Sequence, residues 1–109
     1  MRTPGALLLM FCANALAQPQ AFERCIACHG DKGDLGPNLS GVFGRKAGSR
    51  DDFRYSRALS RSGIVWNEQN LDAFLKAPEQ FLPGTRMPFE GLPSDAERAA
   101  VIQHLKSLK

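Results

Sequence analysis

Apolar side chains recur at helical spacing in three parts of the chain, and long polar, glycine-rich stretches separate them. Asn67 can cap a helix whose apolar stripe is Leu71, Phe74 and Leu75, and Pro78 ends that helix. The pattern therefore predicts one amphipathic helix between positions 68 and 77.

A second helix is predicted at the C-terminal end. Ser94 followed three residues later by Glu97 is a capping box, which satisfies free N–H groups at the start of a helix. Lys106 lies in the last turns, where a positive charge is favourable for the helix dipole. The inner face of this helix consists of Val101, Ile102, Leu105 and Leu108.

The remaining elements are short. Ala21 and Phe22 begin a helical pattern in which Phe22 faces inward, and Ser56–Ser62 predicts a short helix that Gly63 stops. Positions 30–52 are rich in glycine and predict an extended loop. Because no segment shows a convincing strand pattern or a repeat, we expect a small all-α domain of three to five helices with long ordered loops.

The first 17 residues have the pattern of a secretory signal peptide. Arg2 precedes the apolar run 6–11, and Ala15–Ala17 has the small residues of a cleavage site. The run is shorter than the roughly 20 residues that span a bilayer. Cys12 as a lipoprotein cysteine is the alternative. We expect export, a domain at 18–109 that starts at Gln18, and no membrane insertion.

Charge and residue inventory limit the possible functions. Residues 18–109 carry 13 Lys and Arg against 11 Asp and Glu, which is too small an excess to indicate binding to nucleic acid or a membrane surface. Within that range the only sulfur or imidazole side chains are those of Cys25, Cys28, His29, Met87 and His104.

Cys25–His29 forms one C-x-x-C-H motif, the attachment pattern of a c-type haem. Two thiols at this spacing project from one helical turn toward two vinyl groups, and the next residue supplies an imidazole to the iron. A redox-active pair, a disulfide or half of a zinc site are the alternatives. A four-thiol zinc site would need a second C-x-x-C, which the sequence lacks.

Met87 is the candidate for the second axial ligand. It lies 58 residues after His29 in a loop bounded by Pro83 and Pro88, which limit the freedom of the backbone. A thioether suits haem iron and raises its reduction potential. The competitors are a packing role for Met87 and ligation by His104, which falls on the predicted last helix between core positions.

Several further segments, in this order, resemble the class I cytochrome c family, close to its mitochondrial and bacterial short-chain members. The resemblance covers 22–109 and implies the small cytochrome c fold around one covalent haem c. The segments are Cys25–His29, Gly36–Leu39, Gly41–Lys46, Tyr55–Ser56, Gly63–Asn67 and Pro83–Met87, with the helix around Arg98.

This resemblance implies a role for individual residues. His29 and Met87 would be the axial ligands of the iron, and Cys25 and Cys28 would carry the thioethers. The Pro37 carbonyl would accept a hydrogen bond from the far nitrogen of His29.

The resemblance also implies further contacts with the haem. Tyr55 and Trp66 would hydrogen-bond a propionate, and Arg45 would offset its charge. Phe89 would cover the haem edge, and Phe74 and Thr85 would line the pocket beside the methionine.

The sequence also departs from the family. Phe74 stands where a Tyr is usual and Leu59 where an Asn is common, so we expect a reduced hydrogen-bond network in the pocket. Mitochondrial members carry several lysines around the methionine loop, where this chain has Glu79, Gln80, Arg86 and Glu90. Arg24 and Arg86 remain as cations there, and we therefore expect weaker electrostatic steering than in those relatives.

The function that follows is one-electron transfer by a monomeric, periplasmic carrier, with no catalytic residue. Its expected partners are redox proteins: a cytochrome bc-type complex, a terminal oxidase or a periplasmic dehydrogenase of a respiratory chain. The alternative is a haem enzyme or a gas or peroxide sensor with a labile sixth ligand.

Overall fold

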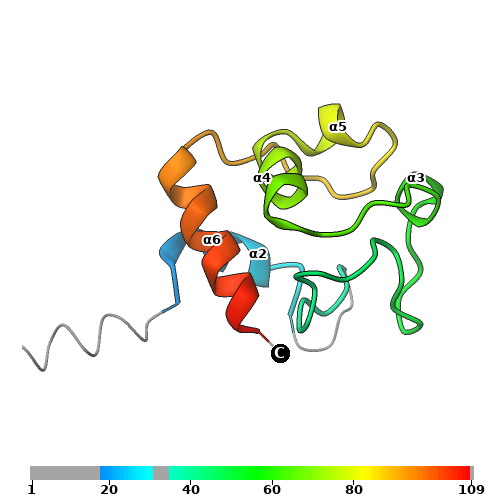
Figure 1. The fold of residues 1–109 in the computed structure, drawn as a ribbon, viewed down its shortest axis with the longest axis horizontal. Helices are drawn as coiled ribbons and strands as arrows, with labels where there is room; N and C mark the ends of the chain where they lie inside the picture. The colour runs from blue at the N-terminus through cyan, green and yellow to red at the C-terminus, as the bar shows by residue number, and fades with distance from the viewer. Residues whose placement is uncertain (1–17, 31–34, 109) are drawn as a thin grey trace, which may run out of the picture.

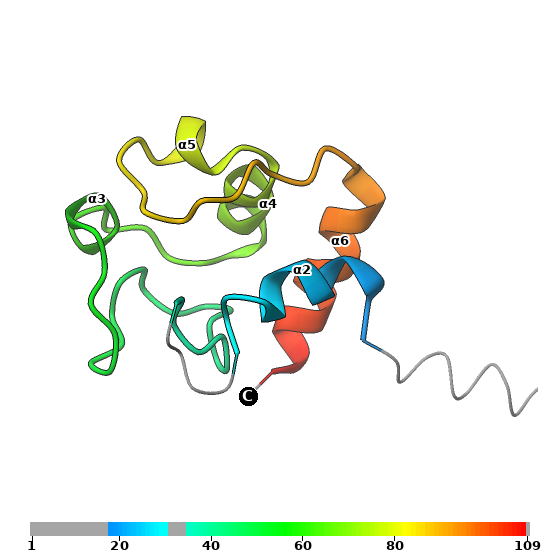
Figure 2. The same ribbon diagram turned by 180° about the vertical axis from the view of Figure 1, so that it is seen from behind.

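The computed structural model describes residues 18–30 and 35–108, and the predicted signal peptide, residues 1–17, lies outside these ranges. Short helices joined by long loops surround the centre of the domain (Figures 1 and 2). Within the described ranges the only β-type pairing is an isolated bridge between Lys46 and Val65, so the predicted all-α class is confirmed. The elements are η1 (Gln20–Phe22), α2 (Glu23–Ile26), α3 (Arg57–Ser60), α4 (Glu68–Lys76), α5 (Pro78–Phe81) and α6 (Asp95–Ser107).

The two longer helices form as their caps predict. The Asn67 side chain accepts a hydrogen bond from the Asn70 N–H at 2.8 Å, and the Ser94 hydroxyl accepts one from the Glu97 N–H at 3.2 Å. These bonds satisfy N–H groups that the first turn of a helix leaves free. The helices α4 and α6 pack on each other, and their buried side chains are Leu71, Phe74, Leu75, Val101, Ile102 and Leu105.

A buried arginine joins three parts of this core. Only 4% of the Arg98 side chain is exposed, and its Nε donates to Asp72 on α4 at 2.8 Å. Its Nη1 donates to the carbonyl oxygens of Leu92 and Pro93 at 2.7 and 3.1 Å, and its Nη2 donates to Asp95. The bond with Asp72 raises the pKa of Arg98, so the guanidinium stays charged. The apolar pattern of α6 did not reveal this residue.

The N-terminal element η1 packs against α6, and α2 continues from η1 (Figure 2). Phe22 is buried, as predicted, and its ring meets the His104 ring edge-on at a centroid distance of 4.5 Å. His104 therefore lies in the contact between η1 and α6, in agreement with a role as a helix residue.

Two short helices differ from the sequence prediction. The sequence predicts Ser56–Ser62 as one helix, but α3 is shorter because the Ser62 hydroxyl donates to the Leu59 carbonyl at 2.9 Å and ends the turn. No helix is predicted from the sequence at α5. Pro78 ends α4, as predicted, and is also the first residue of α5, a position where its missing N–H costs nothing.

Backbone hydrogen bonds hold the long loop between α2 and α3 in place. Gly44 donates to the Trp66 carbonyl at 2.7 Å, Trp66 donates to Arg45 at 2.9 Å, and Ala47 donates to Ile64 at 2.7 Å. These bonds keep Arg45 next to Trp66. None of the described helices has the length and apolar character that crossing a membrane requires.

Candidate functional site

The C-x-x-C-H motif occupies the last turn of α2 and the residues after it. The N–H groups of Cys28 and His29 both donate to the Cys25 carbonyl, at 3.1 and 2.8 Å, so the two thiols stand on one helical turn. Both thiols are free and half-buried. Burial raises the pKa of Cys25, and Arg24 opposes this shift. The turn thus presents two neighbouring sulfur atoms.

The His29 ring is fixed by the residues that follow the motif. Its Nδ1 lies 2.7 Å from the Pro37 carbonyl oxygen, the hydrogen bond that the resemblance implies. Because a carbonyl only accepts, Nδ1 must carry the proton, which leaves the lone pair of Nε2 free. This is the tautomer that binds a metal through Nε2.

Gly36 leaves the space that the His29 ring occupies. This role of Gly36 is not predicted from the sequence. A Cβ atom at Gly36 would lie 2.8 Å from both Cε1 and Nδ1 of His29, closer than such contacts occur. The Gly36 N–H also donates to the Cys28 carbonyl at 3.0 Å. The sequence does carry one signal for this role: a glycine stands directly before Pro37, whose carbonyl accepts the hydrogen bond from His29.

Met87 lies on the extended segment between α5 and α6. The Thr85 hydroxyl accepts a hydrogen bond from the Met87 N–H at 3.3 Å, and the Phe89 N–H donates to the Met87 carbonyl at 2.9 Å. Thr85 therefore orients the backbone of Met87, and both side chains are half-buried.

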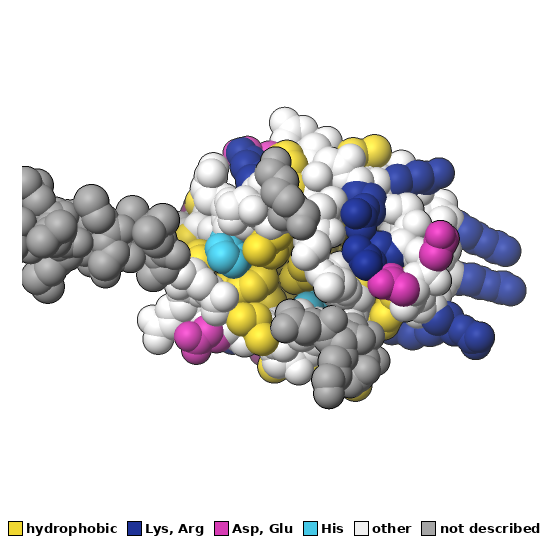
Figure 3. Space-filling model, turned by 90° about the horizontal axis from the view of Figure 1, so that it is seen from below, with side chains coloured by type: hydrophobic (Ala, Val, Ile, Leu, Met, Phe, Trp, Pro, Cys, Tyr) yellow, Lys and Arg dark blue, Asp and Glu magenta, His cyan; other side chains and the backbone are white. Residues whose placement is uncertain are grey.

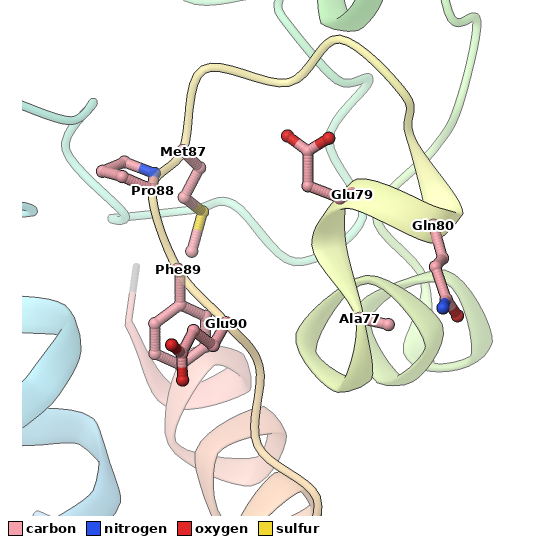
Figure 4. A pocket seen from close by; sticks show the side chains of 7 residues that line it. All are labelled: Ala77, Glu79, Gln80, Met87, Pro88, Phe89 and Glu90. Atoms are coloured by element: carbon pink, nitrogen blue, oxygen red, sulfur yellow. The ribbon is translucent and has the colours of Figure 1, made fainter.

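A cavity of about 390 Å³ separates this segment from α5 (Figure 4). Met87 and Phe89 line it on one side, and Glu79 and Gln80 of α5 line it on the other. His29 and the two cysteines do not line this cavity. One side of Met87 therefore borders this cavity. The segment that carries the C-x-x-C-H motif contacts the segment of Met87 at a different place.

Arg24 and Phe89 form the contact between these two segments. The guanidinium carbon of Arg24, on α2 beside Cys25, lies 5.2 Å from the centroid of the Phe89 ring, a cation–π contact. It joins the helix of the haem motif to the segment of Met87. Phe89 is predicted from the sequence as a site residue, whereas this role of Arg24 is not, because nothing local signals a contact across 65 positions.

Arg45, Trp66 and Phe74 form a second group of predicted site residues. Trp66 is buried, and its ring centroid lies 5.1 Å from that of Phe74. The ring centroids of Phe74 and Phe81 are 6.3 Å apart. The backbone N–H of Trp66 also donates a hydrogen bond to the Arg45 carbonyl oxygen. The Nη1 atom of Arg45 is buried without a hydrogen-bond partner in the described part of the chain. An unpaired buried guanidinium nitrogen requires an acceptor, and an anion would supply one.

Tyr55 is placed differently from Trp66. It lies half-buried in the loop before α3, where its ring packs edge-on against Phe53 at 5.2 Å. Leu59, the other departure from the family, is half-buried at the edge of the core. The structure therefore brings Arg45 and Trp66 together directly, while Tyr55 stands with Phe53.

These donors match one kind of cofactor. The site offers two adjacent thiols, an imidazole with a free Nε2, a thioether, and a buried guanidinium nitrogen that lacks an acceptor. Two cysteine thiols that add to the vinyl groups, an imidazole and a methionine thioether are the protein groups that hold a c-type haem, and a propionate would pair with the guanidinium. A small all-α fold with this donor set defines a c-type haem protein.

Comparison with known proteins agrees with this class. The family model described as Cytochrome c matches residues 17–109. A cytochrome c from Tetrahymena pyriformis is 51% identical over 88 residues, covering 79% of this chain and 80% of that protein. A cytochrome c2 iso-2 from Magnetospirillum fulvum is 45% identical over 93 residues, with 83% and 97% covered. The structure of cytochrome cH from Methylobacterium extorquens superposes with a TM-score of 0.78 at 39% identity, covering 81% of this chain and 92% of that one.

The chain belongs to the cytochrome c family. It has the small all-α fold of that family and binds one covalent haem c. It is an electron-transfer protein and not an enzyme. The predicted family, fold class and cofactor are confirmed.

Proposed function

We propose that Cys25 and Cys28 hold the haem through thioether bonds and that His29 and Met87 are its axial ligands. The hydrogen bond of 2.7 Å from His29 Nδ1 to the Pro37 carbonyl carries this proposal, because it leaves Nε2 as the free donor. Met87 is the single methionine of residues 18–109, and Thr85 orients its backbone. When bound, the haem iron supplies one-electron oxidation and reduction.

The surrounding residues hold this donor set in one arrangement. Pro37 keeps the His29 ring oriented and increases its basicity. Arg45, with its unpaired Nη1, and the adjacent Trp66 would bind a propionate, and Tyr55 would add its hydroxyl from its place beside Phe53. Phe74 and Phe89 supply apolar surface on the methionine side, since Phe74 is buried and Phe89 half-buried beside Met87. A rigid site of this kind needs little rearrangement when the charge of the iron changes.

The chain acts as an exported carrier between redox proteins. The signal-peptide pattern of residues 1–17 supports export to the periplasm, and the family match begins at residue 17. Partners of the expected classes are a cytochrome bc-type complex, a terminal oxidase or a periplasmic dehydrogenase. N-terminal sequencing of the periplasmic protein should give Gln18, and an intact Met1 in the cytoplasm would contradict export.

Visible spectra of the purified protein in both oxidation states test the ligand set. We expect a low-spin spectrum, haem that stays with the protein in acidified organic solvent, and no change on addition of carbon monoxide to the reduced form. Prompt uptake of carbon monoxide would show an open sixth position and favour an enzyme or a gas sensor. A colourless protein would contradict haem binding itself.

A further inference from the structure

Positive side chains gather at one end of the molecule. Figure 3 shows Lys and Arg side chains over the end where α3 lies, away from the N-terminal elements. Residues 45–61 contain six Lys and Arg and two Asp, a formal charge of +4. The rest of residues 18–109 contains seven basic and nine acidic side chains, a charge of −2. The charge is thus concentrated in a few loops and one helix.

Most of these cations are free to meet another molecule. We define the arginine patch as Lys46, Arg50, Arg54, Arg57 and Arg61. All of them except Arg50 are exposed, and no ion pair between described residues includes these four. Arg50 pairs with Asp52 at 2.8 Å. Unpaired exposed cations raise the local potential and attract anionic surfaces.

The patch is one surface, although two segments contribute to it. Lys46 and Arg50 belong to the loop before α3, and Arg57 and Arg61 belong to α3 and its C-cap. The segments meet at Gly48, where a Cβ atom would lie 3.0 Å from the Ser60 Cα. The bridge between Lys46 and Val65 adds Val65, which is 45% exposed.

The patch also adjoins the proposed haem site. Lys46 follows Arg45, whose carbonyl accepts the Trp66 N–H at 2.9 Å. The methionine loop has no excess of positive charge, because the exposed Glu79 and Glu90 balance the exposed Lys76 and Arg86. The expectation of weak steering was drawn from this loop and did not take the patch into account. An acidic molecule would therefore be attracted more strongly at the patch than at the loop.

We propose that the arginine patch is the docking surface for an acidic face of a redox partner protein. This inference rests on the proposed function, since Arg45 and Trp66 connect the patch to the cofactor only if they bind it. Arginine forks pair with carboxylates in a fixed geometry. A partner at this surface would lie at the propionate side of the site, where Arg45 and Trp66 stand.

The composition of the patch favours a protein over a lipid surface. Asp51 and Asp52 stand exposed among the arginines, so the patch has a mixed pattern of charge. A partner with its own pattern of charges can match this, whereas a uniform anionic membrane would repel both carboxylates. Val65 supplies a small apolar centre, as protein interfaces have, and not the Trp or Phe that inserts into lipid.

The test compares two double variants of the haem-loaded protein with equal loss of charge. Arg57→Gln/Arg61→Gln changes the patch, and Lys76→Gln/Arg86→Gln changes exposed cations on the methionine side. The probe is poly-L-glutamate, titrated by calorimetry at low ionic strength. We expect the patch variant to bind about threefold to tenfold more weakly. The matched variant should stay within about twofold of the unaltered protein.

A second measurement needs no variant. Backbone NMR shifts of the unaltered protein should change on addition of poly-L-glutamate at 46–65 and disappear at high salt. Larger changes at 76–90, or a larger loss of binding in the matched variant, would overturn the proposal. Binding through the patch to phosphatidylglycerol vesicles but not to poly-L-glutamate would also overturn it, in favour of a lipid surface.

The two proposals can fail separately. Each variant is checked by its visible spectrum before titration. A low-spin spectrum with unchanged poly-L-glutamate binding in the patch variant rejects the docking surface and leaves the electron carrier intact. An unaltered protein that lacks haem rejects the proposed function, whatever the titration gives.

Discussion

The orientation of His29 depends on two residues that follow its motif. The Pro37 carbonyl holds Nδ1, and the bare Cα of Gly36 leaves room for the ring. Neither residue could act in this way with a different backbone path. The sequence predicts the bond to Pro37 through the family resemblance, but the space at Gly36 appears only once the loop has folded back.

Gly36→Ala should therefore disturb the site. The added methyl would lie 2.8 Å from two atoms of the ring, so the ring or the loop must move. We expect a loss of about 1–3 kcal/mol in the free energy of unfolding, which is typical of overpacking, and an altered low-spin spectrum. Chemical denaturation and visible spectra measure the two effects.

Gly30→Ala is the matched control for this substitution. It follows His29 directly, and among the described residues a Cβ atom there meets only the Ile26 carbonyl oxygen, at an ordinary 3.6 Å. Its spectrum should stay unchanged. Equal effects of the two substitutions would show that Gly36 has no special relation to the ring.

At the scale of elements, the segment that carries Met87 is anchored to the helical core through the residues that follow it, at positions 91 and 92. The Leu92 N–H donates to the Leu75 carbonyl at 2.7 Å, at the end of α4. Gly91 has a φ of +119°, and a Cβ atom there would lie 2.1 Å from the Lys76 carbonyl oxygen. Arg98 binds the Leu92 carbonyl from α6. Both long helices thus fix the position of this segment.

Arg98→Lys should loosen this anchor. An ammonium group lacks the planar fork that reaches Asp72 and the Leu92 carbonyl together. We expect unfolding by denaturant to show a loss of about 2–3 kcal/mol, because charge-assisted hydrogen bonds are lost in a buried position. Lys106→Gln on the same helix removes a partly exposed pair with Glu68 and a cation–π contact with Phe43, and should cost less, about 1 kcal/mol. Similar losses in the two variants would contradict the anchoring role.

The composition of the methionine loop predicts its behaviour at high pH. A lysine in this loop could replace methionine on the iron once it loses its proton, because a neutral amine is a nitrogen ligand for the metal. Positions 77–88 contain no lysine, and Lys76 is the last residue of α4. The methionine–iron charge-transfer band should therefore persist to higher pH than in lysine-rich relatives. Its loss at mildly alkaline pH, prevented by Lys76→Ala, would identify Lys76 as a replacing ligand.

Elements with local signals could be predicted from the sequence, and those held by distant contacts could not. Caps and apolar stripes lie within a few residues of each other, so α4 and α6 begin at the predicted positions. The four residues of α5 carry no such pattern. Arg98 is polar at a position that only its partners on α4 and in the segment 92–93 explain.

The molecule as a whole has few contacts between its helices. Among the described elements α3 packs against no other helix, and α2 and α5 are each four residues long. Such short helices are not stable alone, and a domain of this size buries little apolar surface without help. The cofactor must therefore complete the core.

Cys25→Ser/Cys28→Ser should reveal this dependence. Without covalent attachment the haem can dissociate, and we expect the far-UV circular dichroism of the haem-free protein to show the loss of most helical signal. Addition of free haem should restore part of it. A haem-free protein that unfolds cooperatively with native helix content would show that the polypeptide core suffices.

The separation of charge described above makes the molecule an electric dipole, with its positive pole beyond α3 and the excess of acidic side chains spread over the rest of residues 18–109. In the field of an acidic body such a dipole experiences a torque before any contact forms. At 0.1 M salt this field extends about 10 Å, so the molecule would rotate during its final approach. First collisions would then occur with one preferred pole forward, and salt would randomise them.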